Sequence, residues 1–251
     1  MIQLPHIPDH DARTRYVTAA GLFLFALSIV NSAWVCDDAY ITFRSIDNCV
    51  NGYGLRWNIA ERVQTFTHPL WLFLLTPVYL LSGNIYYSSV FLNVVLSVSA
   101  AWLVVRFFAS NAVGVVWICL ILGLSKAFVD FSTSGLENSL HHFLLAVYLV
   151  VWFKCHEGQS RQLLLFFVCS LVLLTRLDGL LLIAPTLLSD IRRNPSGMLH
   201  RILIGFSPLL IWSIIATLYY GSPLPNTAYA KLGTGAERSL LVGLGSTSST
   251  R

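Results

Sequence analysis

The sequence predicts an all-α membrane protein, a bundle of helices that crosses a lipid bilayer several times. Of its 251 residues, 55% are hydrophobic and only 11% are charged, whereas soluble domains carry about 25% charged residues. The mean hydropathy is +0.68, and a soluble domain of this length could not bury so much apolar surface. Low polarity excludes a disordered chain, and a scattered net charge of +4 argues against nucleic-acid binding.

The first apolar run covers residues 17–35 and follows Arg13 and Arg15. It is long for the apolar core of a signal peptide and has no small-x-small cleavage site before Cys36. We therefore expect a retained first helix whose basic flank, residues 1–16, lies in the cytoplasm.

Seven further apolar runs follow, and several are shorter than the ~20 residues that a full span requires. Their boundaries must extend into polar neighbours, or the helices must break around internal cavities. The runs cover residues 69–81, 86–108, 112–124, 140–153, 163–175, 177–188 and 202–220.

Loop charges orient these runs. Residues 154–162 and 189–201 are rich in Arg and Lys, which places them in the cytoplasm by the positive-inside rule. By alternation, polar clusters at 36–68, 135–138, 175–179 and from 219 onward share the opposite face.

Residues 36–68 and 135–138 can share a face only if an even number of crossings separates them, yet three apolar runs lie between. One run must therefore fail to cross. The two shortest are 69–81 and 112–124, and the sequence does not choose between them.

Two adjacent carboxylates, Asp37 and Asp38, follow the first helix. Acids beside a membrane are candidates for function. Mutual repulsion is expected to raise the pKa of at least one of them, which suits a general base that takes a proton from a sugar hydroxyl. A solvated end of the first helix explains the pair equally well.

The other polar clusters also allow two interpretations. His68 is either a structural hydrogen-bonding residue or a ligand-binding one. Arg176 and Asp178 either pair in a tight turn, or Arg176 binds a phosphate with its planar fork. Glu137 either ends a turn or lines a site, and Lys231 either extends to the membrane interface or joins Asn226 in a site.

The five cysteines form no metal-binding spacing. Cys36 and Cys49 fall in one loop, so a disulfide between them stays open on an oxidising face.

Six strings together resemble the polytopic GT-C glycosyltransferases, and most closely their arabinofuranosyltransferase branch of mycobacterial cell-wall synthesis and bacterial pilin glycosylation. The resemblance covers about residues 17–233. The strings are DDAYITFR at 37–44, NGYGL at 51–55, ERVQTFTHPLW at 61–71, SGLE at 134–137, TRLDG at 175–179 and GSPLPNTAYAK at 221–231.

The resemblance implies a GT-C-type module over residues 17–232, with short amphipathic helices in the outer loop 36–68. It implies a bacterial inner-membrane enzyme whose active site faces the periplasm. Such an enzyme transfers a sugar, here arabinofuranose, from a polyprenyl-phosphate donor to a cell-envelope glycan or protein acceptor. By the same resemblance Asp37 or Asp38 is the catalytic base. Residues expected to bind substrate or donor phosphate are Tyr40, Arg44, His68, Glu137, Arg176, Asp178, Asn226 and Lys231.

No cofactor is certain from the sequence, although the aspartate pair could ligate a divalent cation such as Mg, Mn or Ca. Expected partners are the polyprenyl-phosphate sugar, the acceptor and the lipid bilayer, with no nucleic acid.

Two alternatives stay open beside the enzyme. One is a lipid or sugar transporter or flippase built from broken helices, although the ionisable residues cluster in loops rather than mid-helix. The other is an inactive, shortened paralogue. Members of the resembled family continue with more helices, whereas residues 233–251 form a polar tail without an apolar run, so we expect a C-terminally truncated member.

Overall fold

The computed structural model describes residues 10–193, 195 and 197–225. These residues form helices joined by loops, with no strand among them, which confirms the prediction of an all-α membrane protein. The helices are α1 (Ala12–Asn31), α2 (Ala39–Val50), α3 (Pro69–Ser82), α4 (Ile85–Phe108), α5 (Ala112–Leu124), α6 (Lys126–Phe131), α7 (Asn138–Lys154), α8 (Gln159–Leu173), α9 (Gly179–Arg193), α10 (Met198–Gly205) and α11 (Ser207–Tyr220).

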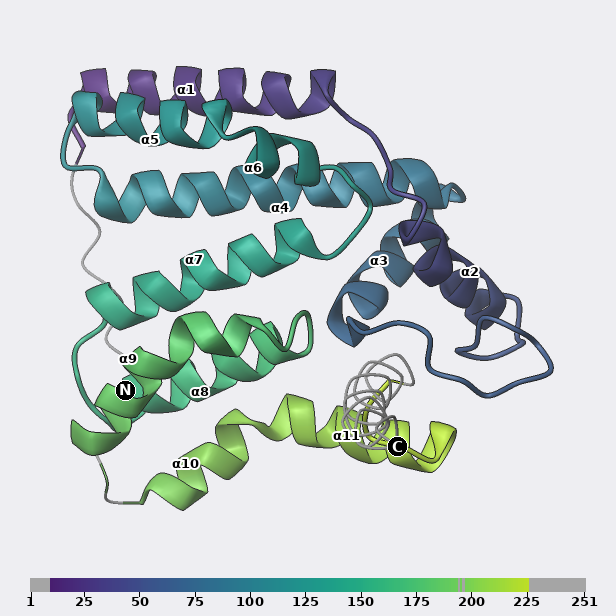
Figure 1. Cartoon of the computed structure of the whole chain (residues 1–251). Helices are drawn as coiled ribbons and strands as arrows, with labels where there is room; N and C mark the ends of the chain where they lie inside the picture. Colours follow the sequence, from purple (N-terminus) through teal and green to yellow (C-terminus); the bar gives the residue numbers. More distant parts are fainter. Residues whose placement is uncertain (1–9, 194, 196, 226–251) are drawn as a thin grey trace, which may run out of the picture.

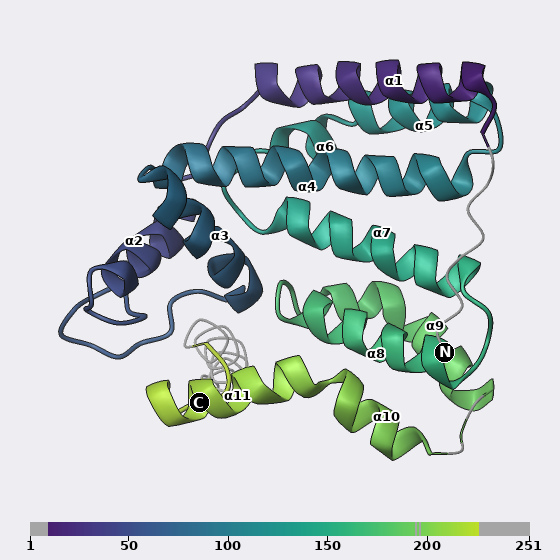
Figure 2. The same cartoon turned by 180° about the vertical axis from the view of Figure 1, so that it is seen from behind.

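Most helices lie side by side in one stack, and their connecting loops gather at its two ends (Figure 1, Figure 2). Along the stack α1 contacts α4 and α5, α4 contacts α7, α7 contacts α8, and α8 contacts α9, α10 and α11. Within the described residues, α1 and α4 are each long and apolar enough to cross a membrane, and α10 with α11 makes a third candidate if the bent pair is one span.

The two ends of the stack differ in charge. The end that holds the start of α1 and the last turns of α4, α7 and α9 is called here the basic end. The opposite end, where α2 and α3 lie, is called the cavity end. The cationic residues at the basic end are Arg13, Arg15, Arg106, Lys154, Arg161, Arg192, Arg193 and Arg201.

Helix α3 is the apolar run that does not lie along the stack. It packs against α2 and the first turns of α4, and both views show it beyond the end of α7 (Figure 1, Figure 2). Helix α5, the other candidate, lies along α1. The loops 36–68 and 135–138 therefore meet at the cavity end, as loop charge predicted, and the backbone N–H of Cys36 donates to the Ser134 carbonyl at 2.8 Å.

Small side chains allow α4 to approach α7 closely. Ser89, Asn93 and Ser97 recur every four residues of α4 and are all buried, so they form one stripe along the helix. Ser97 Oγ donates to Ser139 Oγ of α7 at 3.0 Å. In lipid, helices associate through such close packing and polar contacts, because their apolar faces gain little from each other.

The predicted run 202–220 is not one straight helix. It is divided at Phe206 into α10 and α11, whose axes are bent by 57°. Pro208 in the first turn of α11 has no N–H to continue the ladder from α10. The freed N–H of Leu209 donates to Ser170 Oγ of α8 at 3.1 Å, so the break is fixed by a side chain of a neighbouring helix.

Helix α2 confirms the prediction of an amphipathic element in the loop 36–68. Its buried residues include Ala39, Thr42, Phe43 and Ile46, three or four positions apart, which is the spacing of one helical face. This face packs into the main core together with Trp71 and Leu72 of α3. The helix is thereby held against the end of the bundle.

Candidate functional site

A polar cavity of about 600 Å³ opens at the cavity end. It is lined by four segments that lie far apart in sequence, together with Pro225. The lining residues are Asp38, Ile41 and Thr42; Thr65 to His68; Leu136 and Glu137; and Thr175 to Asp178. All four clusters that loop charge placed on one face therefore contribute to a single cavity, the last of them through Pro225.

A chain of polar contacts crosses the cavity wall. Thr42 Oγ1 lies 2.7 Å from His68 Nε2, and His68 Nδ1 lies 3.2 Å from Glu137 Oε2. The other Glu137 oxygen accepts from Arg176 Nη1 at 3.3 Å. Arg176 then holds Asp178 through two bonds of 3.1 and 2.9 Å. Two acids, two bases and a hydroxyl thus form one connected network.

His68 and Glu137 are both buried at 7% exposure. Burial lowers the pKa of His68, and this effect outweighs the neighbouring Glu137, which acts to raise it. A neutral imidazole with its proton on Nδ1 fits both contacts, because it donates to the Glu137 carboxylate and accepts from the Thr42 hydroxyl through Nε2. This proton position is inferred from the partners.

Arg176 is half-buried and Asp178 is exposed. Their bidentate pairing lowers the pKa of Asp178 and raises that of Arg176. Of the two interpretations of this turn, the paired turn is therefore formed. Because the guanidinium also borders the cavity, pairing does not prevent it from contacting a ligand.

Asp37 and Asp38 precede α2, where the positive end of a helix dipole favours carboxylates. Asp38 lines the cavity, whereas Asp37 is not part of its wall. The Cys36 thiol and the backbone N–H of Asp38 donate to Asp37 at 3.2 and 3.0 Å, and these bonds lower the pKa of Asp37. Like-charge repulsion therefore does not raise the pKa of Asp37, because hydrogen bonds to its charged form prevail.

Cys36, Asp37 and Asp38 offer ligand atoms that lie within 4.8 Å of one another. Burial raises the pKa of the Cys36 thiol, and the thiol donates its proton to Asp37, so it is a poor ligand for a soft metal. The two carboxylates suit a hard divalent cation that takes its remaining oxygens from water or phosphate. Cys36 and Cys49 are free thiols, so the disulfide that the sequence left open is not formed.

Hydrogen bonds from two buried side chains, Trp71 and Asn93, fix the loop that carries Glu137. Trp71 Nε1 donates to the Gly135 carbonyl at 3.1 Å. In the amide orientation that matches its neighbours, Asn93 accepts from the Gly135 N–H at 3.1 Å and donates to the Leu136 carbonyl at 3.2 Å. Both side chains are buried, so the position of Glu137 is set by the junction of α3, α4 and α7.

Tyr40 and Arg44 do not reach the cavity. Tyr40 is exposed and its ring packs on Phe43, and the Arg44 guanidinium stacks over the Trp57 ring at 4.6 Å. Helix α2 turns by roughly 100° per residue, so Asp38 and Thr42 share the cavity face while positions 40 and 44 point elsewhere. Asn226 and Lys231 lie outside the described residues.

Four threonines of the wall were missed as site residues from the sequence, namely Thr42, Thr65, Thr67 and Thr175. Thr42 follows Asp38 by four positions, and this helical spacing is the signal that could have found it. The other three gave no signal, because threonine is ordinary in loops.

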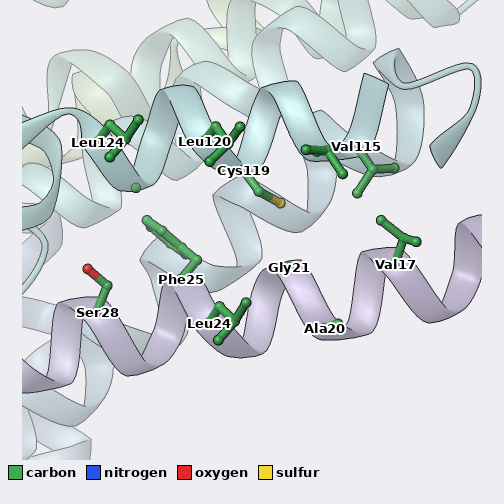
Figure 3. Close-up of a pocket in the computed structure, with 12 residues that line it drawn as sticks. Val17, Ala20, Gly21, Leu24, Phe25, Ser28, Val115, Cys119, Leu120 and Leu124 are labelled. Carbon is green, nitrogen blue, oxygen red and sulfur yellow. The ribbon is translucent and has the colours of Figure 1, made fainter. Parts of the chain in front are cut away.

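A second cavity, of about 380 Å³, lies between α1 and α5. Figure 3 shows Leu24 and Phe25 of α1 facing Cys119 and Leu120 of α5, with the Ser28 hydroxyl near one end. The other lining residues are aliphatic or small. This groove carries no group suited to catalysis.

Fold and site together define an all-α membrane protein with an acidic, histidine-containing cavity at one end of its bundle. The chain is similar to the terminal beta-(1->2)-arabinofuranosyltransferase of Mycobacterium tuberculosis (strain ATCC 25618 / H37Rv), with 30% identity over 246 residues. The match covers 87% of this chain, and the chain spans 38% of the length of that relative. No family model matches the chain, and no solved structure matches it.

Proposed function

We propose that the chain is a membrane glycosyltransferase of the GT-C family, or a part of one, and that the cavity end holds its active site. Similarity to an arabinofuranosyltransferase supports the class of reaction. The observation that carries the proposal is the cavity in which Asp38, the His68–Glu137 pair and Arg176 border one space. The proposed donor is a polyprenyl-phosphate sugar, with arabinofuranose as the sugar.

Asp38 is the proposed general base. It is exposed, lines the cavity and lies outside the network of the other acids, so its carboxylate is available to a substrate hydroxyl. In the reaction it takes the proton of the acceptor hydroxyl, whose oxygen bonds to the anomeric carbon of the sugar. The bond from that carbon to the donor phosphate breaks, and the polyprenyl phosphate leaves with the bonding electrons.

Arg176 is the proposed phosphate-binding residue. Its guanidinium is oriented by Glu137 and Asp178 from two sides, so little side-chain entropy is lost when it binds an anion. Planar N–H groups are well matched to phosphate oxygens. His68 and Glu137 act as positioning residues, because they fix Arg176 and the wall beside Asp38.

A divalent cation at Asp37 and Asp38 would neutralise charge on the leaving phosphate. The two carboxylates at the start of α2 are the residues that would hold it.

We propose that the cavity end faces the periplasm and the basic end faces the cytoplasm. Arginines and lysines concentrate at the basic end, and such a bias marks the cytoplasmic side of a membrane protein. The acceptor is then a cell-envelope glycan or a protein.

Separate Asp37→Asn and Asp38→Asn variants test the function. Membranes that contain the full chain are given a polyprenyl-phosphate arabinose donor and a synthetic arabinoside acceptor, and labelled product is measured. Loss of a general base predicts a drop of about 10²–10⁴-fold in Asp38→Asn, with a smaller drop in Asp37→Asn. Asp47→Asn is the matched control, since Asp47 lies on α2 outside the cavity and accepts from Tyr79.

Unchanged transfer by Asp38→Asn at normal expression would remove Asp38 as the base. If no variant or wild-type membrane forms product, but the chain moves the donor lipid between leaflets, the transporter alternative is correct.

A further inference from the structure

His141 of α7 lies behind the wall of the candidate active site. Its side chain is buried and does not line the cavity. Its backbone N–H donates to the Glu137 carbonyl at 2.9 Å, so it follows that buried acid by one helical turn. A buried imidazole requires a hydrogen-bond partner, and His141 has one in the turn between α8 and α9.

The partner is Thr175, which directly precedes Arg176 in that turn. His141 Nδ1 lies 3.3 Å from Thr175 Oγ1. The threonine hydroxyl donates its single proton to the Val172 carbonyl at 2.6 Å, so the proton between the two side chains belongs to Nδ1. This proton position is inferred from the partners. His141 is therefore the donor, and its bond reaches from α7 to the backbone segment that carries the arginine.

Gly179, the first residue of α9, packs against the same imidazole. A Cβ at Gly179 would lie 2.5 Å from His141 Cε1 and 2.7 Å from Val172 Cγ1, which is too close for any side chain. Glycine alone allows the backbone to approach the ring in this way. His141 thus contacts both ends of the segment 175–179, on which Arg176 and Asp178 lie.

The first turn of α7 also holds the side chain of Arg176. Glu137 Oε1 and Asn138 Oδ1 each accept from Arg176 Nη1 at 3.3 Å. Helix α7 therefore contacts this segment at two levels, the guanidinium through Glu137 and Asn138 and the backbone ends through His141. The second contact fixes the point from which the arginine side chain starts.

We propose that His141 is a positioning residue for Arg176, which holds the segment 175–179 where the guanidinium borders the cavity. The inference rests on the proposed function, in which Arg176 binds the donor phosphate. Because His141 is not part of the cavity wall, it acts through that segment and not on the substrate. Loss of the contact should therefore weaken donor binding and leave the transfer step almost unchanged, which raises KM without lowering kcat.

The test compares two amides at position 141. Asparagine places its amide N–H near the position of Nδ1, whereas glutamine is one carbon longer and places it near that of Nε2. Membranes with the full chain are given a polyprenyl-phosphate arabinose donor and a synthetic arabinoside acceptor. His141→Gln should raise the KM for the donor about tenfold, the effect of one lost hydrogen bond. His141→Asn should restore most of the wild-type KM.

A double-mutant cycle separates this role from a general structural one. In an Arg176→Lys background, His141→Gln should raise the donor KM little further, because residues that act through one contact are not additive. His142→Gln is the matched control. His142 is the next residue of α7, but its ring stacks on Phe128 of α6 at 4.7 Å, so the donor KM should be unchanged.

Gly179→Ala tests the same contact from the other side. The added methyl group must displace the imidazole or the turn, so the donor KM should rise although His141 is intact. This variant keeps the inference testable if His141→Gln fails to fold, and the unfolding temperature of each purified variant shows whether it has folded.

Binding of a sugar-free polyprenyl phosphate, followed as a rise in unfolding temperature, adds a measurement that needs no turnover. If the wild type transfers sugar and His141→Gln keeps its donor KM, the inference is wrong and the proposed function stands. If the wild type only binds the lipid phosphate and His141→Gln weakens that binding, the inference stands and the proposed function fails. Additive effects in the cycle, or an equal rise of KM in His142→Gln, would also overturn the inference.

Discussion

His68 Nδ1 lies 3.2 Å from Glu137 Oε2, and both side chains are buried where the loop before α3 meets the loop before α7. Glu137 uses its other oxygen for Arg176. One carboxylate therefore connects the start of α3 with the turn between α8 and α9.

Glu137→Gln should destabilise the protein and impair transfer together. The amide keeps the size of the carboxylate but loses its charge, so Arg176 and the Nδ1–H of His68 lose a charged acceptor in a buried place. A loss of about 1–3 kcal/mol in the free energy of unfolding is expected, measured by denaturation in detergent.

Glu157→Gln is the control for this loss. Glu157 is an exposed carboxylate that pairs with Arg193 and Arg161 at the basic end, and exposed pairs contribute little. Equal losses in the two variants would contradict a special role for Glu137.

Arg176→Lys should reduce transfer while leaving the fold intact. Lysine keeps the positive charge but cannot make the two parallel bonds to Asp178 together with the bond to Glu137. We expect a fall of at least about tenfold in kcat/KM, the effect of one charged hydrogen bond, with a raised KM for the donor. Arg193→Lys, at an exposed arginine of the basic end, should leave both constants unchanged. A similar fall in that variant would show that the loss does not depend on the hydrogen-bond geometry at Arg176.

Acidification should destabilise the protein through His68. Burial holds its pKa below the ordinary 6.5 in the folded state, so below pH 6.5 the unfolded chain binds a proton that the folded chain resists. The contribution of neutral His68 to the free energy of unfolding is therefore fully present above pH 6.5 and is lost as the pH falls below it. His68→Gln should flatten this decline in unfolding measurements across that range.

His156→Gln serves as the comparison, since His156 is exposed in the loop between α7 and α8. If it flattens the pH dependence as much as His68→Gln does, the assignment to His68 is wrong.

Gly135→Ala should be markedly more destabilising than Gly83→Ala. Both glycines have positive φ, +77° and +69°, so both substitutions incur backbone strain. A Cβ at Gly135 would also lie 2.9 Å from Ala39 Cβ and Val35 Cγ1, whereas at Gly83 it meets nothing within 4 Å. Overpacking adds about 1–3 kcal/mol, and equal unfolding free energies for the two variants would contradict the close approach.

Much of the fold could be predicted from the sequence because lipid forces backbone hydrogen bonds to close within helices. Apolar runs thus gave α3, α4, α5 and α7 to within two residues at each end, whereas α1 begins five residues and ends four residues before its predicted run. The break at Phe206 was missed, since it depends on Pro208 and on Ser170, a residue of another helix. Sequence could not choose between α3 and α5 as the run that fails to cross, because the two are about equally short and apolar.

The site was predictable where residues follow one another and not where they meet across helices. The Arg176–Asp178 pair was foreseen as one of two interpretations. The contact of His68 with Glu137 joins residues 69 positions apart, as their numbers show, and depends on how α3 and α7 pack. Tyr40 and Arg44 were proposed beside Asp38 because they are its neighbours in sequence, and the rotation of α2 carries them away.

The position of α3 beside the stack has a consequence for the path of the chain. Because α3 begins and ends at the cavity end, it does not change the end at which the chain lies, and α1 begins at the basic end while α11 ends at the cavity end (Figure 1, Figure 2). Reporter proteins attached ahead of Ala12 and behind Tyr220 should therefore reside in different compartments, one reducing and one oxidising.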